Sequence, residues 1–132
     1  MNVLIVEDEF IGRILLKELL QSYGSCTLAT SGREALDALR RAYRENDPFD
    51  LVCLDIMMPG MDGQRVLLEL RQLEKEQCRE AICSTTVFMV TTLDDSRNII
   101  KAFTEGRCQA YLVKPVSREK LTYHLRECQL VH

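Results

Sequence analysis

Several features that would assign the chain to a common class of protein are missing. Its 132 residues hold no apolar stretch of the roughly 20 residues that a membrane span needs. The formal net charge is -3, and without a basic excess we expect no direct contact with nucleic acid. No signal-peptide pattern precedes the first apolar run, so we expect a cytoplasmic protein that does not bind membranes.

Cysteine patterns that bind metals are missing as well. The chain has six cysteines, but none are spaced as Cys-x-x-Cys and no histidine pair accompanies them. This argues against a zinc site or a disulfide framework, and we interpret the cysteines as reduced structural thiols. Cys78 and Cys83, in an expected surface loop, are the one pair that we consider for redox behaviour.

What the sequence does contain is a regular alternation of strand and helix patterns. Short apolar runs suited to buried strands occupy residues 2–8, 26–29, 51–55, 86–91 and 110–114. A helical spacing of apolar residues follows each of them. We predict an α/β fold with a doubly wound, five-stranded parallel sheet, flavodoxin-like, of strand order 2-1-3-4-5. The length suits one domain over residues 1–132 with no output domain attached.

The ends of the helices have their own sequence signals. Gly24 and Gly106 follow the first and fourth helical patterns, where a glycine in the left-handed conformation commonly ends a helix. Ser31 and Glu34 are spaced as a capping box for the second helix, and Ser117 is the expected cap of the last. The polar stretch after the third helix, residues 74–85, predicts a helix extension and a loop.

Charged residues stand at the carboxyl ends of three predicted strands. Glu7 and Asp8 follow the first strand, Asp55 ends the third, and Lys114 ends the fifth. In the predicted order the first and third strands are neighbours, so their acidic ends should meet at one edge of the sheet. Carboxylates without histidine favour Mg²⁺, and also fit Mn²⁺. We expect Asp8 and Asp55 to be direct ligands, and the longer Glu7 to act through water.

Such a site can carry out phosphoryl transfer. A carboxylate that attacks phosphorus forms an acyl phosphate, and the transfer requires mainly positioning and neutralisation of charge. Asp55 is the candidate nucleophile, Lys114 can neutralise a phosphoryl oxygen, and Thr91 can donate its hydroxyl to another.

Four segments of the chain form a recognisable set. They are VLIVEDE at 3–9, LDIMMPGMDG at 54–63, MVTT at 89–92 and GxxxAYLVKP at 106–115. Together they resemble the receiver domain of bacterial two-component response regulators. The resemblance implies that Asp55 accepts a phosphoryl group from a sensor histidine kinase or a histidine phosphotransfer protein. It also implies that Asp8, Asp55 and the backbone carbonyl of Met57 hold Mg²⁺, with Glu7 assisting. Glu7 stands where the family more often has aspartate.

The same resemblance implies how the switch works. Lys114 would pair with the phosphoryl group and precede a cis peptide bond to Pro115, while Thr91 and Tyr111 would form the switch pair. The shape change would reach the face of the fourth helix, fifth strand and fifth helix, where a downstream effector or a second copy of the chain would bind. The domain would then be a signalling module rather than an enzyme, assisting its own phosphorylation and slow dephosphorylation.

Three alternative functions remain open from the sequence. A haloacid dehalogenase-like phosphatase shares the phosphoaspartate chemistry, but it needs a second acid where this chain has Met57. A flavodoxin-like electron carrier needs a loop that cradles phosphate where this chain has Glu7 and Asp8. A receiver-like adaptor that takes no phosphate would have no use for Asp55 and Lys114. The sequence leaves open whether the domain acts alone or within a longer protein.

Overall fold

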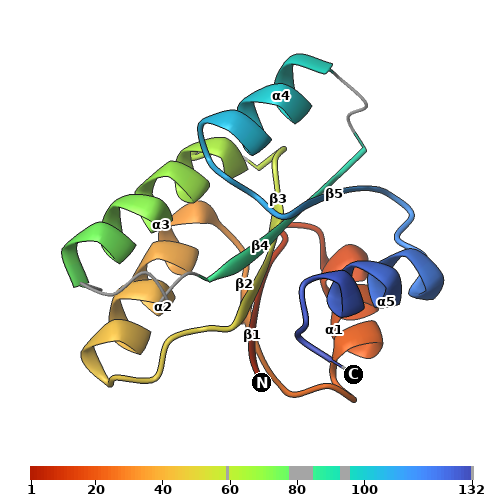
Figure 1. Cartoon of the computed structure of the whole chain (residues 1–132), viewed down its shortest axis with the longest axis horizontal. Coiled ribbons are helices and arrows are strands. Elements are labelled where there is room, and N and C mark those ends of the chain that lie inside the picture. Colours follow the sequence, from red (N-terminus) through yellow and green to blue (C-terminus); the bar gives the residue numbers. More distant parts are fainter. Residues whose placement is uncertain (59, 78–84, 93–95, 132) are drawn as a thin grey trace.

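A single parallel sheet forms the centre of the protein. The computed structural model describes residues 1–58, 60–77, 85–92 and 96–131. The strands are β1 (Asn2–Val6), β2 (Ser25–Ala29), β3 (Leu51–Asp55), β4 (Thr86–Thr91) and β5 (Ala110–Val113). They lie in the order β2-β1-β3-β4-β5 and every pair is parallel (Figure 1). The predicted fold class and strand order are confirmed.

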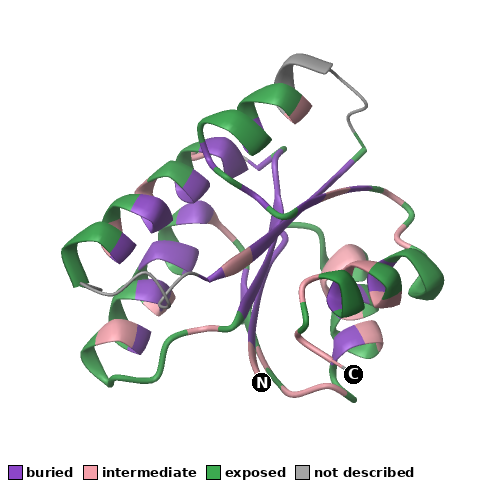
Figure 2. Ribbon diagram, in the orientation of Figure 1, coloured by how far each residue is buried: buried purple, intermediate pink, exposed green. Residues whose placement is uncertain are grey.

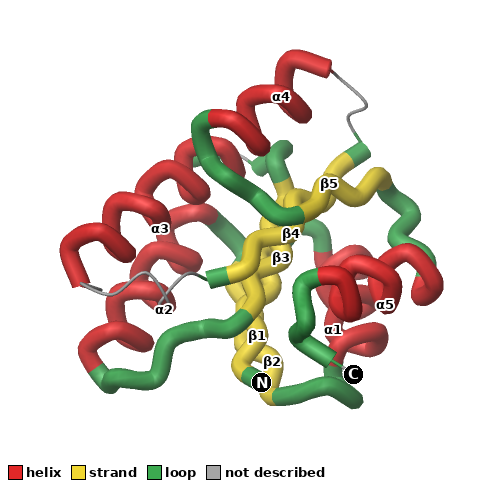
Figure 3. The backbone as a smooth tube through the Cα atoms, in the orientation of Figure 1, coloured by secondary structure: helices red, strands yellow, loops and turns green. Residues whose placement is uncertain are grey.

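Helices cover both faces of this sheet. They are α1 (Phe10–Leu20), α2 (Gly32–Arg44), α3 (Gly63–Gln77), α4 (Ser96–Thr104) and α5 (Arg118–Glu127). Figure 3 shows α1 and α5 on one side of the strands and α2, α3 and α4 on the other. In the part of the chain that the structure describes, no helix combines the length and apolar character of a membrane span.

The alternation of side chains along each strand divides the core between the two faces. On β1, Val3 and Ile5 pack with Leu16 of α1 and Leu121 of α5. Their neighbours Leu4 and Val6 pack on the opposite face, in the cluster that includes α2, α3 and α4. Figure 2 shows the central strands β1, β3 and β4 as almost continuously buried, with exposed residues on the outer sides of the helices, whereas the edge strand β2 is largely exposed. Burial on both faces explains why these three strands read as uninterrupted apolar runs.

The prediction that Gly24 ends α1 in the left-handed conformation is wrong. The helix ends at Leu20, and among the described glycines only Gly60 has a positive φ, +83°. A Cβ at Gly24 would lie 1.9 Å from the carbonyl oxygen of Met1, which accepts a hydrogen bond from the N–H of Ser25. Glycine is therefore required here because any side chain would collide with the backbone of Met1, the residue before β1. Gly106 likewise has no positive φ; its successor Arg107 adopts φ 55° instead.

The cap of α2 differs in one contact from the predicted capping box. Ser31 Oγ accepts from the N–H of Glu34, as predicted. The carboxylate of Glu34, however, accepts from the N–H and the hydroxyl of Thr30, at 3.0 and 2.7 Å, instead of closing onto Ser31. Thr30 can offer two donors to the carboxylate, which the backbone of Ser31 alone cannot. The predicted cap of α5 is confirmed, since Ser117 Oγ accepts from the N–H of Lys120.

An unexpected buried ion pair lies in the second half of α3. The sequence predicted a polar helix extension from residue 74, and α3 does continue to Gln77, but Glu74 is buried together with Arg71 one turn before it. The guanidinium of Arg71 connects α3 to the residue before β4 and to the loop between α4 and β5. It donates to Glu74 Oε1 at 2.6 Å, to the carbonyls of Thr85, Gly106 and Arg107 at 2.8–2.9 Å, and to Gln109 Oε1 at 3.4 Å.

The cysteines that the structure describes have the properties of structural thiols. Cys26, Cys53, Cys108 and Cys128 are free. Burial raises the pKa of Cys53 to about 12 and that of Cys108 to about 11, so both remain protonated and unreactive at neutral pH. Cys78 and Cys83, the pair considered for redox behaviour, lie outside the described residues, as does the rest of 78–84 within the stretch where the loop was predicted.

Candidate functional site

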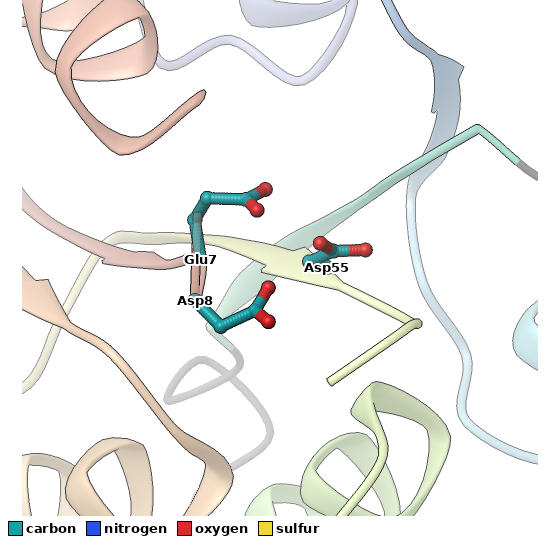
Figure 4. Close-up of side chains that lie close together, drawn as sticks. All are labelled: Glu7, Asp8 and Asp55. Atoms are coloured by element: carbon teal, nitrogen blue, oxygen red, sulfur yellow. The ribbon is translucent and has the colours of Figure 1, made fainter. Parts of the chain in front are cut away.

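Three carboxylates meet where β1 and β3 end. The register pairs Val6 with Leu54, so the residues that follow these strands emerge next to each other. Glu7, Asp8 and Asp55 each offer an oxygen, and these oxygens all lie within 4.8 Å of one another. Figure 4 shows the three side chains gathered at the ends of the two strands. The cluster that the sequence predicted from separate segments is therefore assembled by the sheet.

The three acids differ in their access to solvent. Glu7 is completely buried and Asp55 is 4% exposed, whereas Asp8 lies on the surface. Backbone groups fix the two buried carboxylates: the N–H of Met57 donates to Asp55 Oδ1 at 3.0 Å, and the N–H of Glu9 donates to Glu7 Oε1 at 3.2 Å. A ligand would thus approach over Asp8 and meet carboxylates whose positions are already set.

Lys114 supplies the positive charge of the cluster. Its Nζ donates to Glu7 Oε2 at 2.6 Å and to Asp55 Oδ2 at 3.1 Å. Its backbone N–H donates to the carbonyl oxygen of Thr91, which ties the end of β5 to the end of β4. The peptide bond to Pro115 is cis, as the resemblance implied. One ammonium opposes three carboxylates, so with all groups ionised the cluster keeps an excess of negative charge that a cation can neutralise.

Burial alters the ionisation of this cluster. It raises the pKa of Glu7 to about 7, and the charge of nearby Asp55 acts in the same direction, while the hydrogen bond from Lys114 opposes both. Burial works to lower the pKa of Lys114, but the hydrogen bond to Glu7 and the charge of Asp55 outweigh it and raise that pKa. Lys114 is therefore charged at neutral pH, and Glu7 shifts readily between its two forms.

The other residues singled out from the sequence lie on β4, on β5 and just after β3. Thr91 is the last residue of β4 and is buried, with Val113 as its partner on β5. Tyr111 lies opposite Met89 in the same pair of strands and is partly buried against the core. The side chain of Met57 is 58% exposed, two residues beyond Asp55. The roles of Thr91 and Tyr111 as a switch, and of the Met57 carbonyl as a ligand, stay predictions.

Sequence reasoning missed Arg13. One of its guanidinium nitrogens donates to the carbonyl oxygens of Glu7 and Asp8, at 3.0 and 3.1 Å, and so holds the acidic segment against α1. Its guanidinium also stacks over the ring of Phe10, 5.6 Å from the centroid. A basic residue near the N-terminus of a helix is unfavourable to the helix dipole. That mismatch was the available signal that Arg13 has another partner.

Comparison with known proteins identifies the family. The model of the response regulator receiver domain matches residues 3–126. The chain is 32% identical over 121 residues to the sensor histidine kinase GacS of Pseudomonas protegens, and 36% identical over 122 residues to the two-component response regulator ORR22 of Oryza sativa. These matches cover 91% and 92% of this chain. The chain spans only 12% and 16% of the two relatives.

Solved structures with this fold include receiver domains bound to ligands. The receiver domain of the histidine kinase CKI1 from Arabidopsis thaliana, complexed with Mg²⁺ and BeF₃⁻, is similar with a TM-score of 0.84 and 27% identity, over 96% of this chain and 87% of that one. A CheX–CheY–BeF₃–Mg²⁺ complex from Borrelia burgdorferi gives a TM-score of 0.81 and 27% identity, over 97% and 88%. The sheet order, the acidic cluster with its lysine and the match over nearly the whole chain agree: this chain belongs to the response regulator receiver domain family, the signalling domains of two-component systems.

Proposed function

We propose that Asp55 is the phosphoacceptor of a signalling switch, and that it takes its phosphoryl group from a phosphohistidine of a partner protein. The observation that supports this most is the setting of its carboxylate. It is nearly buried, held by Lys114 and by the N–H of Met57, and close to two further carboxylates. In the transfer an Asp55 oxygen bonds to phosphorus while the phosphorus–nitrogen bond breaks, and the imidazole that leaves is protonated by solvent.

A divalent cation fits the composition of the site. All the side-chain ligands are carboxylates, which suit Mg²⁺ and also Mn²⁺, and the excess negative charge disfavours an incoming phosphoryl group unless a cation is present. We propose that Asp8, Asp55 and the carbonyl of Met57 hold the ion, with Glu7 acting through a water. Such an ion neutralises charge on the transferring phosphoryl oxygens.

Lys114 and Thr91 complete the proposed site. The ammonium of Lys114 already contacts Asp55, so it is placed to pair with a phosphoryl oxygen on that residue. The hydroxyl of Thr91 would donate to another oxygen, and Tyr111 would turn inward into the space that this movement leaves. Because the end of β4 is hydrogen bonded to the end of β5 through Thr91 and Lys114, movement at the site can pass to β5.

The surface around β5 supports a role in contacts with other proteins. Several large apolar side chains are exposed on α4, β5 and α5, among them Ile100 at 60% and Tyr123 at 59% exposure. These elements border the edge strand β5, and exposed apolar side chains along a sheet edge can form an interaction site. We propose that a downstream effector binds the face of α4, β5 and α5 in the phosphorylated state, and that a second copy of the chain is the competing occupant.

Loading with a small phosphodonor tests the proposed function. Incubated with Mg²⁺ and acetyl phosphate, the protein should gain the mass of one phosphoryl group, and peptide mapping should place it on Asp55. Chelation of the metal should prevent the gain. The proposal would be overturned if no adduct formed or if the adduct lay on another residue. Continuous turnover of small phosphate esters would also overturn it, in favour of a phosphatase.

The affinity for Mg²⁺ should fall in mildly acidic solution. Because burial raises the pKa of Glu7 to about 7, the folded metal-free site holds a proton at pH values where a free glutamate has already lost it. That proton has to leave for Glu7 to assist the cation, so affinity should drop by up to about tenfold per pH unit below 7. Calorimetric titration at about pH 6 and about pH 8 measures this. Glu7→Gln should flatten the dependence, and equal affinities in the wild-type protein would contradict it.

A further inference from the structure

The first turns of α1 contain a glycine that the helix itself does not need. Gly12 is the third residue of α1, whereas Gly32 and Gly63 are the first residues of their helices. Within a helix, glycine is the least favourable residue after proline. The backbone of Gly12 has no positive φ that would require glycine. The reason for glycine must therefore be space around the missing side chain.

That space is occupied by Glu7. A Cβ built on Gly12 would lie 3.2 Å from Cδ and 3.3 Å from Cγ of Glu7, with Oε1 at 3.5 Å. Carbon atoms in ordinary van der Waals contact are about 3.5–4.0 Å apart, so a side chain at position 12 would press on the carboxyl end of Glu7. The nearest of these atoms, Cδ, is absent from aspartate, the acid that is shorter by one methylene.

Glu7 has little freedom to move away from such pressure. The residue is fully buried, its Oε1 accepts from the N–H of Glu9, and its Oε2 accepts from Lys114 at 2.6 Å. Lys114 in turn contacts Asp55. If the carboxylate of Glu7 were displaced by a few tenths of an ångström, the ammonium of Lys114 would thus shift as well, and with it the contact to Asp55.

We propose that Gly12 is a positioning residue of the acidic site. By lacking a Cβ it leaves the slot in which the long side chain of Glu7 lies against Lys114, and so it sets the arrangement of the carboxylates. The part of this proposal that concerns cation binding rests on the proposed function, while the steric coupling between Gly12 and Glu7 does not.

A double-mutant cycle with two readouts tests it. Gly12→Ala is made in the wild-type protein, in Glu7→Gln, which keeps the shape of the side chain, and in Glu7→Asp, which removes one methylene. The first readout is the midpoint of thermal unfolding without metal. Gly12→Ala should raise the midpoint in the Glu7→Asp background, as expected for alanine in a helix. It should leave the midpoint unchanged or lower it in the wild-type and Glu7→Gln backgrounds.

The second readout is the Mg²⁺ dissociation constant, measured by calorimetry. Gly12→Ala should weaken binding on the order of tenfold in the wild-type background, the lower end for residues that orient metal ligands, and by clearly less in the Glu7→Asp background. Ile11→Ala is the matched control, because Ile11 is a neighbouring exposed residue of α1 and alanine also suits a helix there. This control should not change Mg²⁺ affinity.

Two outcomes would overturn the proposal. One is a Gly12→Ala effect on the unfolding midpoint that is the same in all three backgrounds. The other is unchanged Mg²⁺ affinity in a folded Gly12→Ala protein whose wild-type parent binds the ion. If the wild-type protein binds no Mg²⁺ at all, the proposed function fails, and the unfolding midpoints alone still decide whether Gly12 positions Glu7.

Discussion

Replacing Asp55 with asparagine is expected to abolish phosphorylation by acetyl phosphate completely. The carboxamide has nearly the same size and can still accept the hydrogen bond from the N–H of Met57, so the fold should persist. It lacks the anionic oxygen that attacks phosphorus, and it removes one of the negative charges that favour a cation. The measurement is intact mass over time with Mg²⁺ present, compared with the wild-type protein under the same conditions.

Asp62→Asn provides the matched control for this experiment. Asp62 is an exposed acid that accepts from the N–H of Arg65 at 2.9 Å, a contact that asparagine preserves. It lies outside the cluster of Glu7, Asp8 and Asp55, so this variant should be phosphorylated at the wild-type rate. An Asp55→Asn protein that gained the adduct as fast as the Asp62→Asn protein would show that the phosphoacceptor lies elsewhere.

The acidic cluster was predictable from the sequence because it depends on the backbone alone. Glu7, Asp8 and Asp55 follow two apolar runs of nearly equal length, and parallel neighbours end at the same edge of a sheet. A register that pairs Val6 with Leu54 then brings the acids together whatever their side-chain conformations. The positions of these charged residues are thus fixed by the strand pattern and the strand order.

The hydrogen-bond partner of each charged group was not predictable in the same way. The sequence assigned Lys114 to the phosphoryl group and Glu7 to a water, and the structure adds a direct contact of 2.6 Å between the two residues. Such a contact depends on differences of a few tenths of an ångström in side-chain placement, which no spacing rule encodes. The same limit explains Thr30, which takes the Glu34 carboxylate that the capping-box pattern assigns to Ser31.

Gly24 and Gly12 illustrate a second limit. Both glycines are present because another part of the chain passes within contact distance, the carbonyl of Met1 in one case and the side chain of Glu7 in the other. Local patterns connect a glycine to backbone conformation, and so they predicted a helix stop at Gly24. The atoms that such a glycine approaches become visible only once the chain is folded.

Arg71 was missed because most of its partners come from segments far from it in the sequence. Its replacement should cause the largest loss in the free energy of unfolding. Arg71→Leu would leave the carboxylate of Glu74 buried without its cation, and the carbonyls of Thr85, Gly106 and Arg107 without their donor. Removing one partner of a buried ion pair typically costs about 3–5 kcal/mol. We expect a loss of this size in the free energy of unfolding, measured by urea denaturation without metal.

A control on the same helix separates burial from charge. Arg65 contacts Glu69 at 3.4 Å, but its side chain is 68% exposed, and exposed pairs contribute only about 0.2–1 kcal/mol. Arg65→Leu should therefore change the free energy of unfolding by no more than that amount. Adding Glu74→Leu to Arg71→Leu should recover part of the loss, because it removes the uncompensated buried charge. If Arg71→Leu cost no more than Arg65→Leu, the guanidinium would not be what joins α3 to the start of β4 and to the loop between α4 and β5.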